Sequence, residues 1–310
     1  MLLEKAKEYA SDCISEKEIT TFEVKKQCEW FLEDLEKQNN DYYPYYFDTK
    51  QIGIIEGILK LLNFATGLGV TGKSIYDGLE NFQAFFIANI FGWRYKTDSK
   101  KYRYREVDLF IPRKNTKTFL AALIFIILML TEDDYSEFYS ICLDRDLAGE
   151  VKKAIAQILN VSPMVGQYFV IPKTLSGRLE CTLTHSFYQP RTAEANRNNS
   201  IKPSAFIADE FGAMKDNSNV EAMKSGQLNI KNPLMFRLTS AYAEDKSIML
   251  GELDYLKKIY KGLETDERLF ALVYYATEEH LWDDIGLQMA NPLKIEENYN
   301  EIRENRKKAL

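Results

Sequence analysis

Five short apolar runs rich in β-branched and aromatic residues recur after residue 105, and they constrain the fold more than any other feature. They are Val107–Ile111, Phe138–Cys142, Ala205–Ala208, Leu234–Leu238 and Leu269–Tyr275. Stretches with helical spacing separate several of them, at residues 119–130, 147–159, 218–228 and 250–262. Strands that are apolar along their whole length are typical of a parallel sheet covered by helices. The alternation therefore predicts an α/β fold with a mostly parallel central sheet and helices on both faces.

The longest apolar segment is Phe119–Leu130, twelve apolar residues without a break. A helix that spans a membrane needs about 20 such residues. Acidic residues follow directly, from Glu132 to Asp134. We therefore expect a helix buried inside the protein and no role in a membrane.

Composition excludes several classes of protein. The chain has 310 residues, of which 45% are hydrophobic, and its net charge of −6 excludes a uniformly basic protein that coats nucleic acid. A local basic stretch from Arg94 to Lys117 holds nine Lys or Arg and three Asp or Glu. It is a candidate surface for a nucleic-acid backbone, and a solvated loop before the sheet is the alternative. Four dispersed cysteines and two histidines favour neither a disulfide framework nor a zinc site.

Two segments compete as the loop that binds a phosphate. Gly67–Ser74 matches the pattern G-x-x-x-x-G-K-[ST] at every position. Glycines let backbone N–H groups surround phosphate oxygens, the lysine reaches the β- and γ-phosphates, and the hydroxyl binds Mg²⁺. The motif requires a strand before it and a helix after it, but the residues before Gly67 have helical spacing.

The second candidate, residues 111–118, departs from the pattern because Ile111 and Thr116 replace both glycines. Its context is nevertheless right, since an apolar strand precedes it and the apolar helix follows it. Lys117 and Thr118 would then lie at the N-terminus of a buried helix, where free N–H groups and the helix dipole favour a phosphate.

A pair of adjacent carboxylates, Asp209 and Glu210, ends the apolar run at residues 205–208. In nucleotide hydrolases the first carboxylate holds Mg²⁺ and the second orients and deprotonates the attacking water. The pair follows Lys117 by about 90 residues. Together they indicate a nucleotide hydrolase.

The motifs, taken in order, resemble those of the large subunits of tailed-phage terminases, the motors that pump DNA into procapsids. The matching segments are Leu79–Gln83 with Phe91–Trp93 (adenine motif), Pro112–Thr118 (variant Walker A), Ile207–Glu210 (Walker B), Leu238–Ala241 (coupling motif) and Asn291-Pro292 near Trp282–Asp284. The resemblance covers about residues 50 to 295. It also implies that Gly72-Lys73 precedes the glutamine segment without binding phosphate.

The resemblance implies a role for each matching residue. Lys117 would bind the β- and γ-phosphates, Thr118 and Asp209 would hold Mg²⁺, Glu210 would activate water, and Gln83 would recognise adenine. The other residues of the nucleotide-binding loop would be Pro112, Arg113, Lys114, Asn115 and Thr116.

Further roles concern motion and neighbouring subunits. Arg113 would touch the γ-phosphate or sense hydrolysis, and Thr239 with Ser240 would couple hydrolysis to motion. Arg197 is the candidate arginine finger that reaches the ATP of a neighbouring subunit, and Arg191 is its rival. Such fingers are worth about 10³–10⁵ in rate.

As a whole, the resemblance implies a RecA-like P-loop ATPase of the ASCE class with a small helical subdomain. We expect an N-terminal helical segment at 1–45, the core at 46–280, and at 281–310 a linker toward a C-terminal nuclease domain that this chain lacks. The expected function is Mg²⁺-dependent ATP hydrolysis that drives double-stranded DNA into a procapsid. We expect the protein to form a ring and to work with the terminase small subunit and the portal protein. The expected location is the cytoplasm of an infected bacterium. A helicase-like P-loop motor and a scaffold that has lost hydrolysis are the alternatives.

Overall fold

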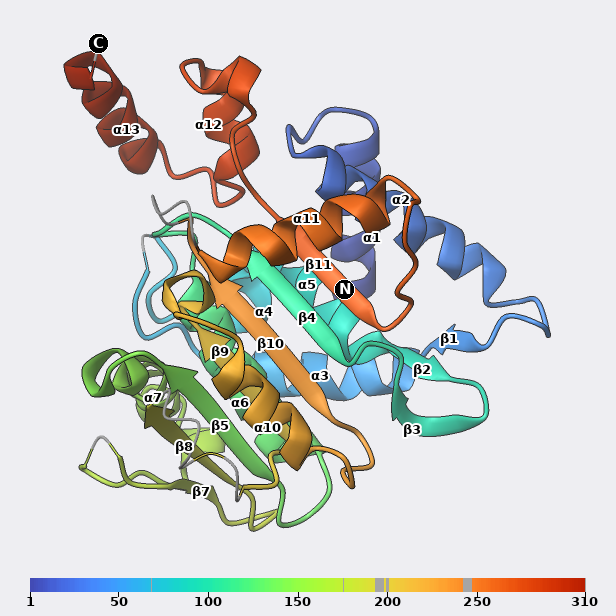
Figure 1. The fold of residues 1–310 in the computed structure, drawn as a ribbon. Helices are drawn as coiled ribbons and strands as arrows, with labels where there is room; N and C mark the ends of the chain where they lie inside the picture. The colour runs from blue at the N-terminus through green and yellow to red at the C-terminus, as the bar shows by residue number, and fades with distance from the viewer. Residues whose placement is uncertain (68, 175, 193–197, 199–200, 242–246, 310) are drawn as a thin grey trace.

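An eight-stranded sheet forms the centre of the computed structural model, which describes all residues except 68, 175, 193–197, 199–200, 242–246 and 310 (Figure 1). In spatial order its strands are β11 (Leu269–Val273), β4 (Glu106–Phe110), β10 (Leu234–Thr239), β9 (Ala205–Asp209), β5 (Glu137–Cys142), β8 (Phe187–Thr192), β7 (Leu179–Cys181) and β6 (Phe169–Val170). The first six are parallel to one another, β7 pairs antiparallel with β8, and β6 pairs antiparallel with β7. The predicted α/β fold with a mostly parallel sheet is confirmed.

Helices cover both faces of this sheet. One face packs against α1 (Leu2–Ile14), α2 (Phe22–Lys37), α3 (Thr49–Leu61), α5 (Asn81–Gly92), α6 (Lys117–Thr131) and α7 (Arg145–Asn160), and the other against α10 (Ser218–Gly226) and α11 (Ile248–Tyr260). Residues of β9 alternate between the faces, because Ile207 joins the first cluster whereas Phe206 and Ala208 join the second. Every residue of β9 is therefore buried, as its continuous apolar run predicts.

The helix predicted from the longest apolar segment is α6, and its residues from Leu120 to Met129 are all fully buried. It packs against α7 and the sheet, which explains why its sequence has no polar face. Among the described residues, no helix combines the length and the apolar character needed to cross a membrane.

Both ends of the chain are helical. The N-terminal part of the chain contains α1 and α2, and Tyr45 already begins β1 (Tyr45–Phe47). Tyr9 of α1 hydrogen-bonds Tyr274, just beyond β11, at 2.9 Å between their hydroxyl oxygens. At the other end α12 (Asp284–Ala290) and α13 (Glu296–Ala309) lie together at the top of Figure 1. The domain boundaries expected at 45 and 280 stay predictions.

Several elements were not foreseen. Strand β8 inserts beside β5, but its sequence FYQPRT has polar residues and a proline and does not read as a buried strand. A second sheet joins β1 (Tyr45–Phe47), β2 (Trp93–Tyr95) and β3 (Asp98–Tyr102). Two short helices, α4 (Ile75–Gly78) and α8 (Pro163–Gly166), are also present.

Candidate active site

The candidate site lies where β4, β10 and β9 end at the same edge of the sheet. Strand β10 separates the strand that leads into residues 111–116 from the strand that ends in Asp209. The loop is fixed to β10 at its start, because the backbone N–H of Ile111 donates to the carbonyl of Thr239 at 3.0 Å. Carboxyl ends of parallel strands are where α/β folds bind ligands.

Lys117 and the two carboxylates, 92 residues away in the chain, meet at this edge. The Lys117 Nζ lies 2.5 Å from Asp209 Oδ1 and 2.7 Å from Glu210 Oε1, and its side chain is 11% exposed. Burial alone would lower the pKa of Lys117, but the charges of Asp209 and Glu210 outweigh it and raise the pKa above its ordinary value. The lysine is therefore held as a cation against the residues predicted to bind Mg²⁺ and activate water.

The loop has an unusual backbone for residues other than glycine. Lys114 has φ 67° and Thr116 has φ 63°, both in the left-handed region. Each costs about 1–2 kcal/mol for a residue with a Cβ. A hydrogen bond of 2.8 Å from Gln83 Nε2 to Thr116 Oγ1 supports the second of them.

Gln83 is 2% exposed, and its other amide atom, Oε1, accepts from the backbone N–H of Glu80 at 3.0 Å. The side chain thereby closes the first turn of α5 and holds the loop. Its predicted contact with adenine stays a prediction. As placed, both ends of its amide already have partners within the protein.

A cavity of about 1000 Å³ opens beside the loop. Its wall includes Pro112, Arg113 and Lys114 of the loop, with α11, the segment after β11, α12 and α13 on the other sides. Arg113 is exposed at this cavity, while Gln83 is not among the described residues that line it. The cavity is large enough for a nucleotide-sized ligand.

Thr239 connects the loop to the segment after Glu210. Its carbonyl accepts from Ile111, and its Oγ1 accepts from the backbone N–H of Gly212 at 2.9 Å. Ser240 lies next to it, also buried, and lines the cavity. Thr239 therefore contacts both segments, and its coupling role stays a prediction.

The donors available for Mg²⁺ are oxygen atoms. Thr118 offers a hydroxyl and Asp209 a carboxylate, which are hard ligands of the kind Mg²⁺ prefers. Within the described residues no group of three or more His, Cys, Asp or Glu could hold a metal. These residues fit a Mg²⁺ that keeps waters and takes its remaining ligands from the phosphates.

The regular motif at 67–74 does not join a strand to a long helix. It lies between α3 and the four-residue α4, and a β-bridge joins its last residue, Ser74, to Asn63, which precedes the motif. The N–H of Gly72 donates to the carbonyl of Phe64 and that of Lys73 to Val70, so both are used within the turn. Lys73 is exposed.

Of the two candidate arginine fingers, Arg191 lies within the described residues. Arg197 lies outside the described residues. Arg191 ends β8, where its Nε donates to Asn198 Oδ1 at 2.9 Å and its guanidinium lies 5.6 Å from the ring centre of Tyr139.

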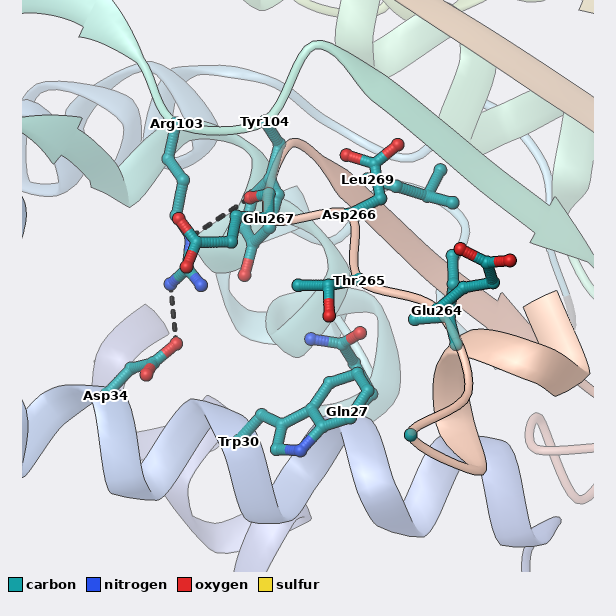
Figure 2. Close-up of a pocket in the computed structure, with 12 residues that line it drawn as sticks. Gln27, Trp30, Asp34, Arg103, Tyr104, Glu264, Thr265, Asp266, Glu267 and Leu269 are labelled. Atoms are coloured by element: carbon teal, nitrogen blue, oxygen red, sulfur yellow. Dashed lines mark hydrogen bonds and ion pairs between the residues drawn. The ribbon is translucent and has the colours of Figure 1, made fainter. Parts of the chain in front are cut away.

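Part of the basic stretch is structural rather than exposed. Arg103 is buried and donates to Asp34 Oδ2 at 2.5 Å, in a pocket of about 250 Å³ between α2 and the segment before β11 (Figure 2). Arg94 is also buried, with its guanidinium 3.6 Å from the ring centre of Tyr102. Lys96 and Lys100 belong to the segment of the β2–β3 hairpin, and Lys100 is exposed there.

Sequence reasoning missed the support of the loop. Asn115 reaches Asn291 at 2.9 Å, between Nδ2 and Oδ1, and Thr116 reaches Gln83. Asn291 and Gln83 stood out only as parts of motifs. No local sequence pattern predicts a hydrogen bond between residues 176 positions apart.

Comparisons with known proteins identify the family of the chain. The model of the family "Terminase large subunit, ATPase domain" matches residues 81–258, more than half of the chain. No curated protein matches significantly. The large terminase of bacteriophage HK97 is similar in structure, with a TM-score of 0.68 and 19% identity over 85% of this chain and 52% of that one. This chain thus spans about half the length of the HK97 protein.

Two further large terminases are similar in structure, with lower TM-scores. The large terminase of a thermophilic bacteriophage has a TM-score of 0.43 and 11% identity, over 62% of this chain and 42% of that one. The large terminase ATPase domain of Thermus phage P74-26 has a TM-score of 0.39 and 12% identity, over 45% of this chain and 61% of that one. The fold is therefore RecA-like, and the chain belongs to the family of terminase large subunit ATPase domains.

Proposed function

We propose that this ATPase domain hydrolyses ATP with Mg²⁺ at residues 112–118 and uses the energy to move double-stranded viral DNA into a procapsid. The observation that carries the proposal is the position of Lys117, at the start of α6 and against Asp209 and Glu210. A lysine, an acceptor pair and a helix N-terminus are the parts that phosphoryl transfer requires.

In the proposed mechanism Lys117 exchanges the two carboxylates for the β- and γ-phosphates. Glu210 is then released to orient a water molecule and to accept its proton. Thr118 and Asp209 would hold Mg²⁺, which neutralises charge on the phosphates. Arg113 would contact the γ-phosphate, and an arginine of a neighbouring subunit, for which Arg197 is our candidate and Arg191 its rival, would complete the charge stabilisation.

Coupling to motion would pass through Thr239, which contacts both the loop and the turn after Glu210. For the DNA we propose lysines of the β2–β3 hairpin, Lys96 and Lys100, as contacts to the phosphate backbone. Nothing in this proposal requires base recognition, since a motor must move any sequence.

The proposed setting is the cytoplasm of an infected bacterium. There the domain would work in a ring of its own copies with the terminase small subunit and the portal protein. A nuclease activity, if the whole protein has one, is expected outside this chain. Membership in the terminase family supports this setting.

The test compares ATP binding and hydrolysis by the parent chain, Lys117→Ala and the matched control Lys73→Ala. We expect Lys117→Ala to abolish nucleotide handling and Lys73→Ala to leave it within about twofold of the parent. Loss of activity only in Lys73→Ala would move the phosphate site to residues 67–74. A parent that neither binds nor hydrolyses ATP, also at concentrations that favour rings, would support the scaffold alternative.

A further inference from the structure

The phosphate loop of this chain contains no glycine from Ile111 to Thr118. Two of its residues, Lys114 and Thr116, nevertheless adopt left-handed backbone that favours glycine. Such a loop does not hold its shape by local preference, so contacts from outside must maintain it. The described contacts show where that support comes from.

Asn115 folds the loop from within. Its Nδ2 donates to the carbonyls of Pro112 and Arg113 at 3.2 and 3.3 Å, and its side chain lies in the buried interior of the loop at 3% exposure. The same Nδ2 donates to Asn291 Oδ1 at 2.9 Å, and the backbone N–H of Leu293 donates to Asn115 Oδ1 at 3.4 Å. The shape of the loop is thus tied to the segment after α12.

The amide of Asn291 is itself oriented. Its Nδ2 donates to the carbonyl of Leu287 at 2.9 Å, which turns Oδ1 toward the loop, and its backbone carbonyl accepts from the hydroxyl of Tyr299 at 3.0 Å. Asn291 is 8% exposed. One bond thus orients the buried side-chain amide and the other anchors the backbone of the same residue, so Oδ1 is directed at Asn115, as a residue that positions another requires.

We propose that Asn291 is a positioning residue for the phosphate loop: through Asn115 it holds residues 112–116 in the shape that binds the phosphates of ATP. The inference rests on the proposed function for its ligand. It adds that nucleotide affinity depends on a residue outside the loop, contributed by the segment that joins α12 to α13.

The matched control is a contact between the loop and α13. Lys114 Nζ pairs with Glu301 Oε2 at 2.9 Å, but both side chains are largely exposed, at 63% and 62%. Exposed ion pairs contribute little, so Glu301→Ala removes a contact between α13 and the loop without removing the buried support from Asn291.

The experiment measures the Kd of a non-hydrolysable ATP analogue with Mg²⁺ for the full chain, well below its melting temperature. We expect Asn291→Ala to raise the Kd about tenfold and Glu301→Ala to change it less than about twofold. In an Asn115→Ala background, Asn291→Ala should add less than about twofold, because the two residues act as one unit. A Kd that hardly changes in Asn291→Ala, or effects that multiply in the double variant, would overturn the inference.

A second readout needs no nucleotide. Hydrogen exchange of the amides at 113–118 in the nucleotide-free chain should become at least about fivefold faster in Asn291→Ala and stay unchanged in Glu301→Ala. Unchanged exchange in Asn291→Ala would reject the positioning role even if the melting temperature fell. If the parent chain binds no ATP analogue, the proposed function fails, whereas exchange still decides the role of Asn291.

Discussion

Replacing each left-handed residue of the phosphate loop by glycine separates backbone strain from hydrogen bonding. At Lys114, glycine removes a cost of about 1–2 kcal/mol for the left-handed backbone. It adds about 0.5–1 kcal/mol because glycine gives the unfolded chain more freedom. The lost ion pair with Glu301 is exposed and contributes little. We therefore expect Lys114→Gly to raise the free energy of unfolding by about 0.75 kcal/mol, the middle of a range of about 0–1.5 kcal/mol that these two contributions give.

At Thr116 the same backbone gain is opposed by a lost contact. Gln83 is almost fully buried, and Thr116→Gly leaves its Nε2 without the acceptor at 2.8 Å. An unsatisfied buried donor costs about 1–3 kcal/mol. From the middle of these ranges the net expectation is a loss of about 1 kcal/mol, opposite in sign to Lys114→Gly although the two φ angles are nearly equal.

Urea unfolding of the parent and both variants, followed by circular dichroism, measures the difference. A third variant, Thr116→Gly in a Gln83→Leu background, removes the stranded donor and should make the glycine substitution stabilising. The reasoning is refuted if Thr116→Gly stabilises the parent as much as Lys114→Gly does. It is also refuted if the Gln83→Leu background leaves the effect of Thr116→Gly unchanged.

Three further predictions follow from the same contacts and from one buried carboxyl. Burial raises the pKa of Glu252 to about 7, so the folded chain keeps a proton that the unfolded chain has released, and this stabilisation is lost as pH rises from about 4.5 to 7. Glu252→Gln should reduce the fall in the free energy of unfolding between about pH 5 and 7.5. At roughly 1.36 kcal/mol per pKa unit, the reduction is at most about 3 kcal/mol. Urea titrations at several pH values measure it, and an unchanged pH profile would contradict this. Thr239→Val leaves the N–H of Gly212 unpaired and should slow ATP hydrolysis at least about tenfold with ATP affinity retained; equal turnover would remove Thr239 from the coupling path. Lys117→Met should lower the melting temperature of the nucleotide-free chain, because it leaves the adjacent charges of Asp209 and Glu210 without a counter-charge. The control, Lys73→Met, should not lower it, because Lys73 is exposed. Equal melting temperatures of the two variants in thermal scans would contradict a stabilising role of the buried charge cluster.

The sequence by itself determined the architecture. The apolar runs at β4, β5, β9, β10 and β11 are strands within a residue or two of their expected bounds, and the uninterrupted apolar segment is the buried α6. Burial on both faces leaves a continuous apolar run, and burial of a whole helix leaves no polar stripe. These signals are local in the chain, so they survive without knowledge of the neighbours. Strand β8 was not predicted, because its polar residues and Pro190 do not form a continuous apolar run.

Only the tertiary structure decided the contacts of the site. Lys117 meets Asp209 and Glu210 because parallel strands end at one edge, and Asn115 meets Asn291 because the chain returns after β11. Gln83 could be singled out by its motif, but its hold on Thr116 could not. A hydrogen bond depends on distance and direction in space, and residues far apart in sequence carry no periodic trace of it. Hydrophobic burial is non-directional, so it leaves a pattern of apolar residues along the chain that can be recognised without knowing their partners. A polar hydrogen bond is directional and forms only where the fold brings its two partners together.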